Sequence, residues 1–244
     1  MTYAIEAKPL WQPNPNTVGD TRMAMFMQAM GHGRYADLWQ WSIDQPEVFW
    51  SKLWDFCGAV GDKGQTVLRD GDRMPGARWF PEARLNYAEN LLKNRDEGEA
   101  LVFWGEDKVK RRLSRAELYA EVARFQRFLV DAGVGEGDRV AGYLPNLPET
   151  LIAMLAATSL GAIWSSASPD FGVQGVLDRF GQIGPKVLFA CDGYWYNGKV
   201  IDCTGKVGEI AARLHAITQA IPDVLLVLDA TAGQNALSQV EAFK

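Results

Sequence analysis

Three short stretches of the chain hold residues whose types and spacing could do chemistry. The first has glycines at 133, 135 and 137, a spacing also found where a dinucleotide-binding loop begins. Such a loop follows a strand and opens a helix, so that the pyrophosphate meets the helix N-terminus. Here the glycines follow a predicted helix and enter a predicted strand, and Asp138 replaces the last glycine of the pattern. Nicotinamide or flavin binding is therefore not predicted.

The second stretch is the Gly-Lys pair at 205 and 206, which could belong to a phosphate-binding P-loop. A P-loop needs a glycine five positions before that pair and a serine or threonine directly after the lysine. Both positions, Val200 and Val207, are valines. The pair is therefore not assigned to a nucleotide.

The third stretch places serines at 165, 166 and 168 in a predicted turn after a strand, where a nucleophile could sit. A nucleophile elbow reads G-x-S-x-G, and the flanks of these serines do not fit it. The whole chain offers only His32 and His215 as a base. Serine hydrolase chemistry is not predicted, and Ser168 and Asp170 are instead expected to cap the following helix.

Metal ligands and disulfides are not predicted either. Cys57, Cys191 and Cys203 are far apart and form no Cys-x-x-Cys pair, and no H-E-x-x-H motif is present. We expect free thiols in a reducing compartment. No metal site is assigned to this chain.

Charge and hydropathy narrow the classes of partner. Among the 244 residues, 25 are basic and 30 acidic, a net charge of −5 that argues against a nucleic-acid partner. The chain lacks a signal peptide and any apolar run long enough for a bilayer, so no membrane partner and a cytoplasmic location are expected. A basic cluster falls on a predicted hairpin, and a solvated hairpin face is favoured over an anion site there: Lys108, Lys110, Arg111, Arg112, Arg115.

The elements that would position these residues alternate regularly after residue 100. Apolar segments at 100–104 and 109–113 predict a hairpin around Glu106-Asp107. Ser114 and Glu117 form a capping box opening a helix that ends at Gly133. Its buried face is predicted to carry Leu118, Val122, Phe125 and Leu129. Beyond it we predict strands at 138–144, 162–165, 186–191 and 224–229, and helices at 148–160, around 176–180 and at 208–220.

Strands separated by single helices favour parallel pairing, because each crossover is right-handed and lies on a sheet face. The predicted fold class is therefore α/β, a doubly wound and mostly parallel sheet with helices on both faces. An irregular arm (1–20) and helices at 21–30, 35–41 and from Pro46 precede it. We expect residues 1–90 to form the arm and a small helical cap, and 91–244 to begin a large α/β domain.

Composition and spacing alone lead no further than an α/β domain that binds a ligand at the carboxyl ends of its strands. A free-standing α/β binding or assembly module is the competing interpretation.

Longer stretches carry a family resemblance. D-A-G-V-G-E-G-D-R-V-A-G-Y-L-P-N-L-P-E-T-L-I-A-M-L-A-A-T-S-L-G-A-I-W-S, residues 131–165, resembles the adenylate-forming superfamily of acyl-CoA synthetases. Residues 41–56 resemble the helical N-terminal cap of acetyl-CoA synthetases. P-L-W-Q-P (9–13) and S-S-A-S-P-D-F-G (165–172) are similar to acetoacetyl-CoA synthetases, and Pro169-Asp170 replaces the glycine pair of acetyl-CoA synthetases.

The resemblance implies a two-step ligase that uses ATP, coenzyme A and magnesium. Acetoacetate, or else acetate or another short-chain acid, would become an acyl-adenylate and then a thioester. The family's phosphate loop (T-S-G-[ST]-T-G-x-P-K), its Y-G-x-T-E motif and its lid lysine are not in this sequence. We therefore expect an incomplete N-terminal part of that fold. It should contain no catalytic residue, bind no cofactor tightly, be inactive alone and self-associate through exposed apolar surface.

The resemblance also implies a coenzyme A contact. Tyr196-Asn197-Gly198-Lys199 matches an R-A-G-R segment that contacts the nucleotide of coenzyme A in acetyl-CoA synthetases, and keeps its glycine and final positive charge. Lys199 could meet the 3′-phosphate and Tyr196 could stack on the adenine, unless Lys199 is merely a surface lysine. Ser168 and Asp170 match the glycine pair that approaches the same nucleotide, and helix capping is the alternative role for them.

Overall fold

A computed structural model describes residues 11–218 and 223–227 of the chain. The chain divides into two compact units, Met1–Leu85 and Asn86–Lys244. The predicted arm lies partly outside the described residues, and within them one helical turn, α1 (Pro15–Val18), corrects the expectation of an irregular segment. The segment 228–229, predicted as the end of the last strand, also lies outside them.

The first unit is built around short helices that share an aromatic cluster. The rings of Phe49 and Phe56 lie 5.9 and 4.9 Å from that of Phe26, which is the buried residue of the second helix. The cap of that helix is Thr21, whose hydroxyl accepts a hydrogen bond from the Ala24 amide. The elements are α2 (Arg22–Ala29), α3 (Tyr35–Asp44), α4 (Pro46–Cys57), β1 (Leu68–Arg69) and β2 (Arg78–Trp79).

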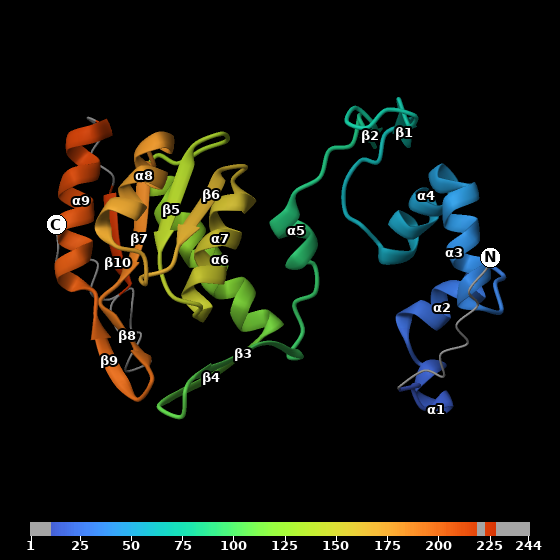
Figure 1. Cartoon of the computed structure of the whole chain (residues 1–244), viewed down its shortest axis with the longest axis horizontal. Helices are drawn as coiled ribbons and strands as arrows, with labels where there is room; N and C mark the ends of the chain where they lie inside the picture. The colour runs from blue at the N-terminus through green and yellow to red at the C-terminus, as the bar shows by residue number, and fades with distance from the viewer. Residues whose placement is uncertain (1–10, 219–222, 228–244) are drawn as a thin grey trace, which may run out of the picture. The chain divides into compact units, whose positions relative to one another are not determined.

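The second unit holds two hairpins, a parallel sheet and the helices that cover the sheet (Figure 1). Its elements are α5 (Tyr87–Leu91), β3 (Glu99–Gly105), β4 (Val109–Ser114), α6 (Arg115–Asp131), β5 (Arg139–Tyr143), α7 (Pro148–Ser159), β6 (Ile163–Ala167), α8 (Val173–Ile183), β7 (Val187–Cys191), β8 (Gly193–Tyr196), β9 (Lys199–Asp202), α9 (Thr204–Thr218) and β10 (Asp223–Val227).

The sheet confirms the predicted fold class. Its strands are parallel in the order β10-β7-β5-β6. The chain moves from β5 to β6 in one direction and from β6 to β7 to β10 in the other. Right-handed crossovers therefore place α7 on one face and α8 and α9 on the opposite face. Helix α6 packs with α7, and α8 packs with α9, as Figure 1 shows.

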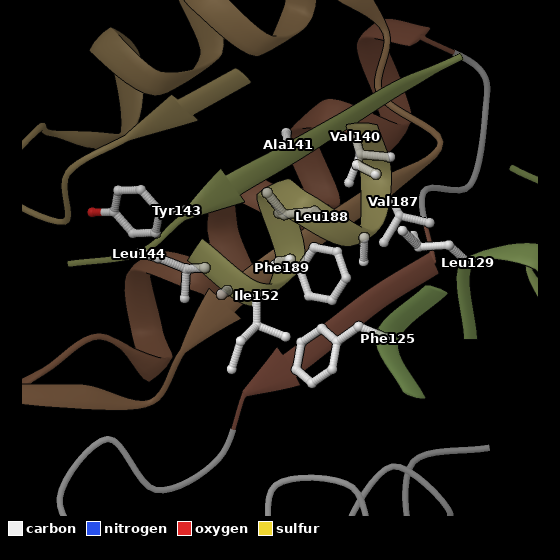
Figure 2. Packing of buried hydrophobic residues seen from close by; sticks show 14 of the residues in the cluster. Phe125, Leu129, Val140, Ala141, Tyr143, Leu144, Ile152, Val187, Leu188 and Phe189 are labelled. Carbon is white, nitrogen blue, oxygen red and sulfur yellow. The ribbon is translucent and has the colours of Figure 1, made fainter. Parts of the chain in front are cut away.

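The core covers both faces of the sheet, with α6 and α7 packed on one face and α8 and α9 on the other. Ser114 and Glu117 form the predicted capping box at the start of α6. All four residues predicted to be buried on this helix are buried, which confirms the helical pattern. The ring of Phe125 stacks on that of Phe189 at 5.6 Å, in the centre of the cluster in Figure 2.

Two features after β7 differ from the sequence prediction. The chain forms a hairpin, β8–β9, in a segment where no strand was predicted. Helix α9 begins four residues earlier than predicted, because the Asp202 carboxylate accepts hydrogen bonds from the amide and hydroxyl of Thr204 at 2.8 and 2.6 Å. Within the described residues, no helix is long and apolar enough to cross a bilayer.

We predict that Phe189→Ala lowers the free energy of unfolding by about 3–5 kcal/mol, because the ring is fully buried and its removal leaves a cavity beside Phe125. Val130→Ala, on the exposed side of α6, is the matched control and should change it by less than about 0.5 kcal/mol. Urea denaturation followed by circular dichroism measures both. Equal losses in the two variants would contradict the assignment of Phe189 to the core.

Candidate functional site

The carboxyl ends of the parallel strands gather several polar segments at one edge of the sheet. Strand β5 ends at Tyr143, β6 at Ala167 and β7 at Cys191. Strands β5 and β7 are neighbours whose following helices lie on opposite faces, and open α/β sheets bind ligands beyond the carboxyl ends of such strands. The loop 168–172 follows β6 and the β8–β9 hairpin follows β7, so both border this edge.

The Tyr143 hydroxyl fixes the loop after β6. The side chain is fully buried, and its oxygen lies 2.9 Å from the Pro169 carbonyl oxygen and 3.0 Å from that of Phe171. Burial raises the pKa of Tyr143 to about 12, so the group remains a neutral donor at physiological pH. This role was missed in the sequence analysis, and the signal that could have revealed it is a tyrosine at the end of an otherwise apolar strand.

Ser168 and Asp170 do not cap α8, contrary to the expectation from sequence. The N-cap of that helix is Gly172, which makes no side-chain capping bond. Instead the Ser168 hydroxyl donates to Asp170 Oδ2 at 2.8 Å and accepts from the Asp170 amide at 3.3 Å. The two residues therefore close their own loop across Pro169.

Asp170 also joins this loop to the hairpin after β7. The Tyr194 hydroxyl donates to Asp170 Oδ1 at 2.8 Å. The hydrogen bonds from Ser168 and Tyr194, together with the positive charge of Lys206, hold the pKa of Asp170 below its ordinary value. Burial and the carboxylate raise the pKa of Tyr194, so the tyrosine remains protonated. Lys206 extends toward the same loop, with Nζ at 3.4 Å from the Pro169 carbonyl oxygen.

The remaining sequence-predicted residues lie at the tip of the β8–β9 hairpin. Asn197 and Gly198 form its two-residue turn, with φ values of 51° and 72° that match the left-handed pair of a type I′ turn. Tyr196 pairs with Lys199 across the turn, and Tyr194 pairs with Ile201. Asparagine followed by glycine is the strongest short hairpin signal, so the hairpin was readable from the sequence.

The structure places Lys199, Tyr196 and the Asp170 contact on one face of this hairpin. Side chains alternate along a strand, so Tyr194 and Tyr196 share a face, and Lys199 lies directly opposite Tyr196 on that same face. Tyr196 is 64% exposed and Lys199 is also exposed. Within the described part of the chain, no carboxylate lies within ion-pair distance of Lys199. The face therefore offers a free ammonium group and an exposed aromatic ring.

The basic cluster at the β3–β4 hairpin is mostly paired with carboxylates. Four of its five members pair with carboxylates: Arg111 with Glu149, Arg112 with Glu99, Arg115 with Asp96 at 2.5 Å and Lys110 with Asp107 at 3.7 Å. The fifth, Lys108, lies 5.8 Å from the ring centre of Trp195. The pairing agrees with the preference for a hairpin surface over an anion site.

Nucleophilic and metal chemistry find little support in the described residues. The three cysteines are free thiols, as predicted, and Cys191 and Cys203 are buried. A hydrogen bond with Cys203 and burial raise the pKa of the Cys191 thiol, which makes it inert. Among residues 11–218 and 223–227, no group of three or more His, Cys, Asp or Glu side chains could hold a metal ion.

The first unit contains a separate apolar pocket of about 400 Å³, lined by Trp50, Leu53, Trp54, Cys57, Trp79 and Phe80. Its aromatic rings contact one another, with Trp50 at 5.7 Å from Trp79 and Trp54 at 5.2 Å from Phe80. The contacts agree with the helical spacing of the tryptophans, which favours packing over ligand stacking. Among the described residues, no charged side chain lines the pocket.

Comparison with known proteins identifies the family. Residues 89–242, more than half of the chain, match the family described as AMP-binding enzyme. The chain belongs to the AMP-binding enzyme family. Residues 35–91 also match the acetyl-coenzyme A synthetase N-terminus, in agreement with the resemblance seen in the helical cap.

Individual members of this family confirm the finer resemblance. An acetoacetyl-coenzyme A synthetase from Rhizobium meliloti is 52% identical over 88% of this chain and 34% of its own length. The solved acetoacetyl-CoA synthetase from Streptomyces lividans superimposes with a TM-score of 0.80 at 37% identity, covering 93% of this chain and 36% of its own. A malonamoyl-CoA synthetase from Penicillium aethiopicum is 36% identical over 77% of this chain and 27% of its own length. The chain spans about a third of the length of such relatives.

We predict that Tyr194→Phe raises the pKa of Asp170 toward its ordinary value of about 3.8, because the carboxylate loses one of its two hydrogen-bonded hydroxyl groups. Carboxyl-detected NMR titration measures the shift. Any stability that comes from this depressed pKa is present above the unfolded-state pKa and is lost as the pH falls through the folded-state value. Tyr196→Phe, which removes an exposed hydroxyl from the same strand, should leave the Asp170 titration unchanged. A Tyr194→Phe protein with the wild-type titration would refute the contact.

Proposed function

We propose that this chain is the N-terminal portion of an ATP-dependent acid–thiol ligase that converts acetoacetate, ATP and coenzyme A to acetoacetyl-CoA, AMP and pyrophosphate. The observation that carries the proposal is the 52% identity with an acetoacetyl-coenzyme A synthetase across 88% of this chain. Membership of the AMP-binding enzyme family supports the adenylate chemistry. The predicted cytoplasmic location and the predicted self-association of the chain remain predictions.

Within that ligase, the exposed face of the β8–β9 hairpin is proposed to receive the nucleotide of coenzyme A. The Lys199 ammonium group would pair with the 3′-phosphate, and the Tyr196 ring would stack on the adenine. Asn197 and Gly198 set the turn between them. Ser168 and Asp170 use their side chains on each other and on Tyr194, so their proposed role is to fix the loop that borders the nucleotide.

The described part of the chain does not provide a site for magnesium or for the phosphates of ATP. The described residues contain no acidic cluster for magnesium, and the whole sequence lacks the family's phosphate loop. No residue of this chain is therefore proposed to act in adenylation. Its proposed contribution is to bind and orient the thiol substrate of the second step.

The relatives differ in the acid that they activate, since a malonamoyl-CoA synthetase is 36% identical over 77% of this chain. We predict that the full-length protein catalyses pyrophosphate exchange faster with acetoacetate than with acetate or malonamate. The 244-residue chain alone should show none with any of them, since it has no phosphate loop. Isotope exchange into ATP measures both. Exchange by the short chain would overturn its predicted inactivity, and a preference for malonamate would reassign the acid.

We predict that Lys199→Ala in the full-length protein raises the KM for coenzyme A by roughly three- to thirtyfold. A hydrogen bond to a charged group is worth about 1.5–3 kcal/mol, but an exposed ion pair only about 0–1, and a partly exposed nucleotide site should fall between. Pyrophosphate exchange should not change, because coenzyme A enters at the second step.

Dephospho-coenzyme A provides the internal control, since it lacks the phosphate that Lys199 would hold. Wild type and Lys199→Ala should use it almost equally. Lys52→Ala, an exposed lysine on α4, should leave both thiols unaffected. An equal loss with both thiols would show that Lys199 does not recognise the 3′-phosphate.

A further inference from the structure

The tips of two hairpins that are far apart in sequence meet in the second unit. The Gly198 amide at the turn of β8–β9 donates to Glu106 Oε2 at the turn of β3–β4, over 2.9 Å and 92 positions of sequence. Beside this bond, the Lys108 ammonium group lies 5.8 Å from the ring centre of Trp195. We call this pair of contacts the hairpin clasp.

The Gly198 amide is available because of the turn geometry. In a two-residue hairpin turn, the amide of the residue after the turn bonds back to the residue before it, while the second turn residue directs its amide outward. The φ values of 51° and 72° at Asn197 and Gly198 place Gly198 in that second position. The Glu106 carboxylate satisfies this outward amide with a charge-assisted hydrogen bond.

The clasp holds the hairpin from the side opposite to the proposed ligand. Trp195 lies between Tyr194 and Tyr196 in β8, so its ring points to the other face. Lys108 approaches that ring, which places the β3–β4 turn against the Trp195 face. The face with Tyr196 and Lys199 stays exposed. The clasp therefore constrains the hairpin without covering the groups that would meet a nucleotide.

The backbone of Glu106 gives a second indication that its placement matters. Its φ is 54°, in the left-handed region that asparagine, aspartate and glycine occupy far more readily than glutamate. A longer acidic side chain at this position reaches the Gly198 amide of the other hairpin. Asp107, the next residue, is also acidic, but its side chain is 90% exposed and pairs locally with Lys110.

We propose that Glu106 is a positioning residue for coenzyme A, which holds the Asn197–Gly198 turn so that Lys199 and Tyr196 face the nucleotide. This inference rests on the proposed function. Glu106 would act by its hydrogen bond to the Gly198 amide and not by its charge, because a carboxylate on its own would repel the phosphate. The negative charge of Glu106 is unfavourable for phosphate binding. The clasp offsets this cost by fixing the position of the Lys199 ammonium group, whose charge is favourable.

The test compares three variants of the full-length protein. Glu106→Ala should raise the KM for coenzyme A by about two- to fivefold, since an exposed hydrogen bond contributes less than a buried one. Glu106→Gln keeps an acceptor oxygen and should stay close to wild type. Asp107→Ala removes a neighbouring negative charge without touching Gly198 and should also stay close to wild type. Pyrophosphate exchange should be unchanged in all three.

Two further measurements separate positioning from charge and from stability. In a Lys199→Ala background, Glu106→Ala should raise the KM by a smaller factor than in wild type, because only Tyr196 of the two positioned groups is left. Millisecond hydrogen-exchange mass spectrometry should show faster exchange in the peptide of residues 193–202 for Glu106→Ala, but not for Asp107→Ala.

The outcomes distinguish this inference from the proposed function. If Lys199→Ala raises the KM while Glu106→Ala leaves it unchanged or lowers it, the positioning role is refuted and the coenzyme site stands. Additive effects of the two substitutions refute the positioning role as well. If Glu106→Ala speeds exchange in the hairpin but Lys199→Ala has no effect on the KM, the coenzyme site itself is refuted, and the inference with it.

Discussion

The central position of β5 is the constraint on which the rest of the second unit depends. Paired with β6 on one side and β7 on the other, the strand is buried along all but its first residue. Its last residue, Tyr143, must still satisfy a hydroxyl group inside an apolar core. It does so on the carbonyl oxygens of the loop after β6. That loop holds Asp170, Asp170 binds Tyr194, and the hairpin that carries Lys199 is thereby tied to the sheet.

The stability of the second unit and the orientation of its loops come from different sets of contacts. The stacked rings of Phe125 and Phe189 and the apolar strands around them supply burial, which dominates stability. The polar contacts at the carboxyl edge are mostly exposed and individually weak. These contacts orient rather than stabilise, because each one fixes a loop or a turn relative to a rigid strand end. A site built in this way can vary its surface residues with little cost to the core.

The sequence predicted those elements whose signals are local. The capping box of Ser114 and Glu117 and the helical period of α6 were sufficient for its start and its buried face, and alternation of strands and helices was sufficient for a parallel sheet. Contacts between residues far apart in sequence were not predictable. The residues around Asp170 do not indicate that it contacts Tyr194, and those around Gly198 do not indicate that it contacts Glu106. Ser168 looked like a helix cap because short polar residues serve caps and closed loops equally well. The family resemblance located the hairpin segment, and the register then showed which of its side chains share a face.

The strand order also affects the order in which the elements of the chain can fold. Val140 of β5 pairs with Val187 of β7, roughly fifty residues later, with a whole strand and two helices between them. Closing the chain between these partners costs conformational entropy before their hydrogen bonds can form. Such non-local parallel pairing therefore slows folding. Helices α6 and α7, which are neighbours in sequence and in space, can associate first. The carboxyl edge therefore forms late, and it takes shape only after β7 has inserted beside β5.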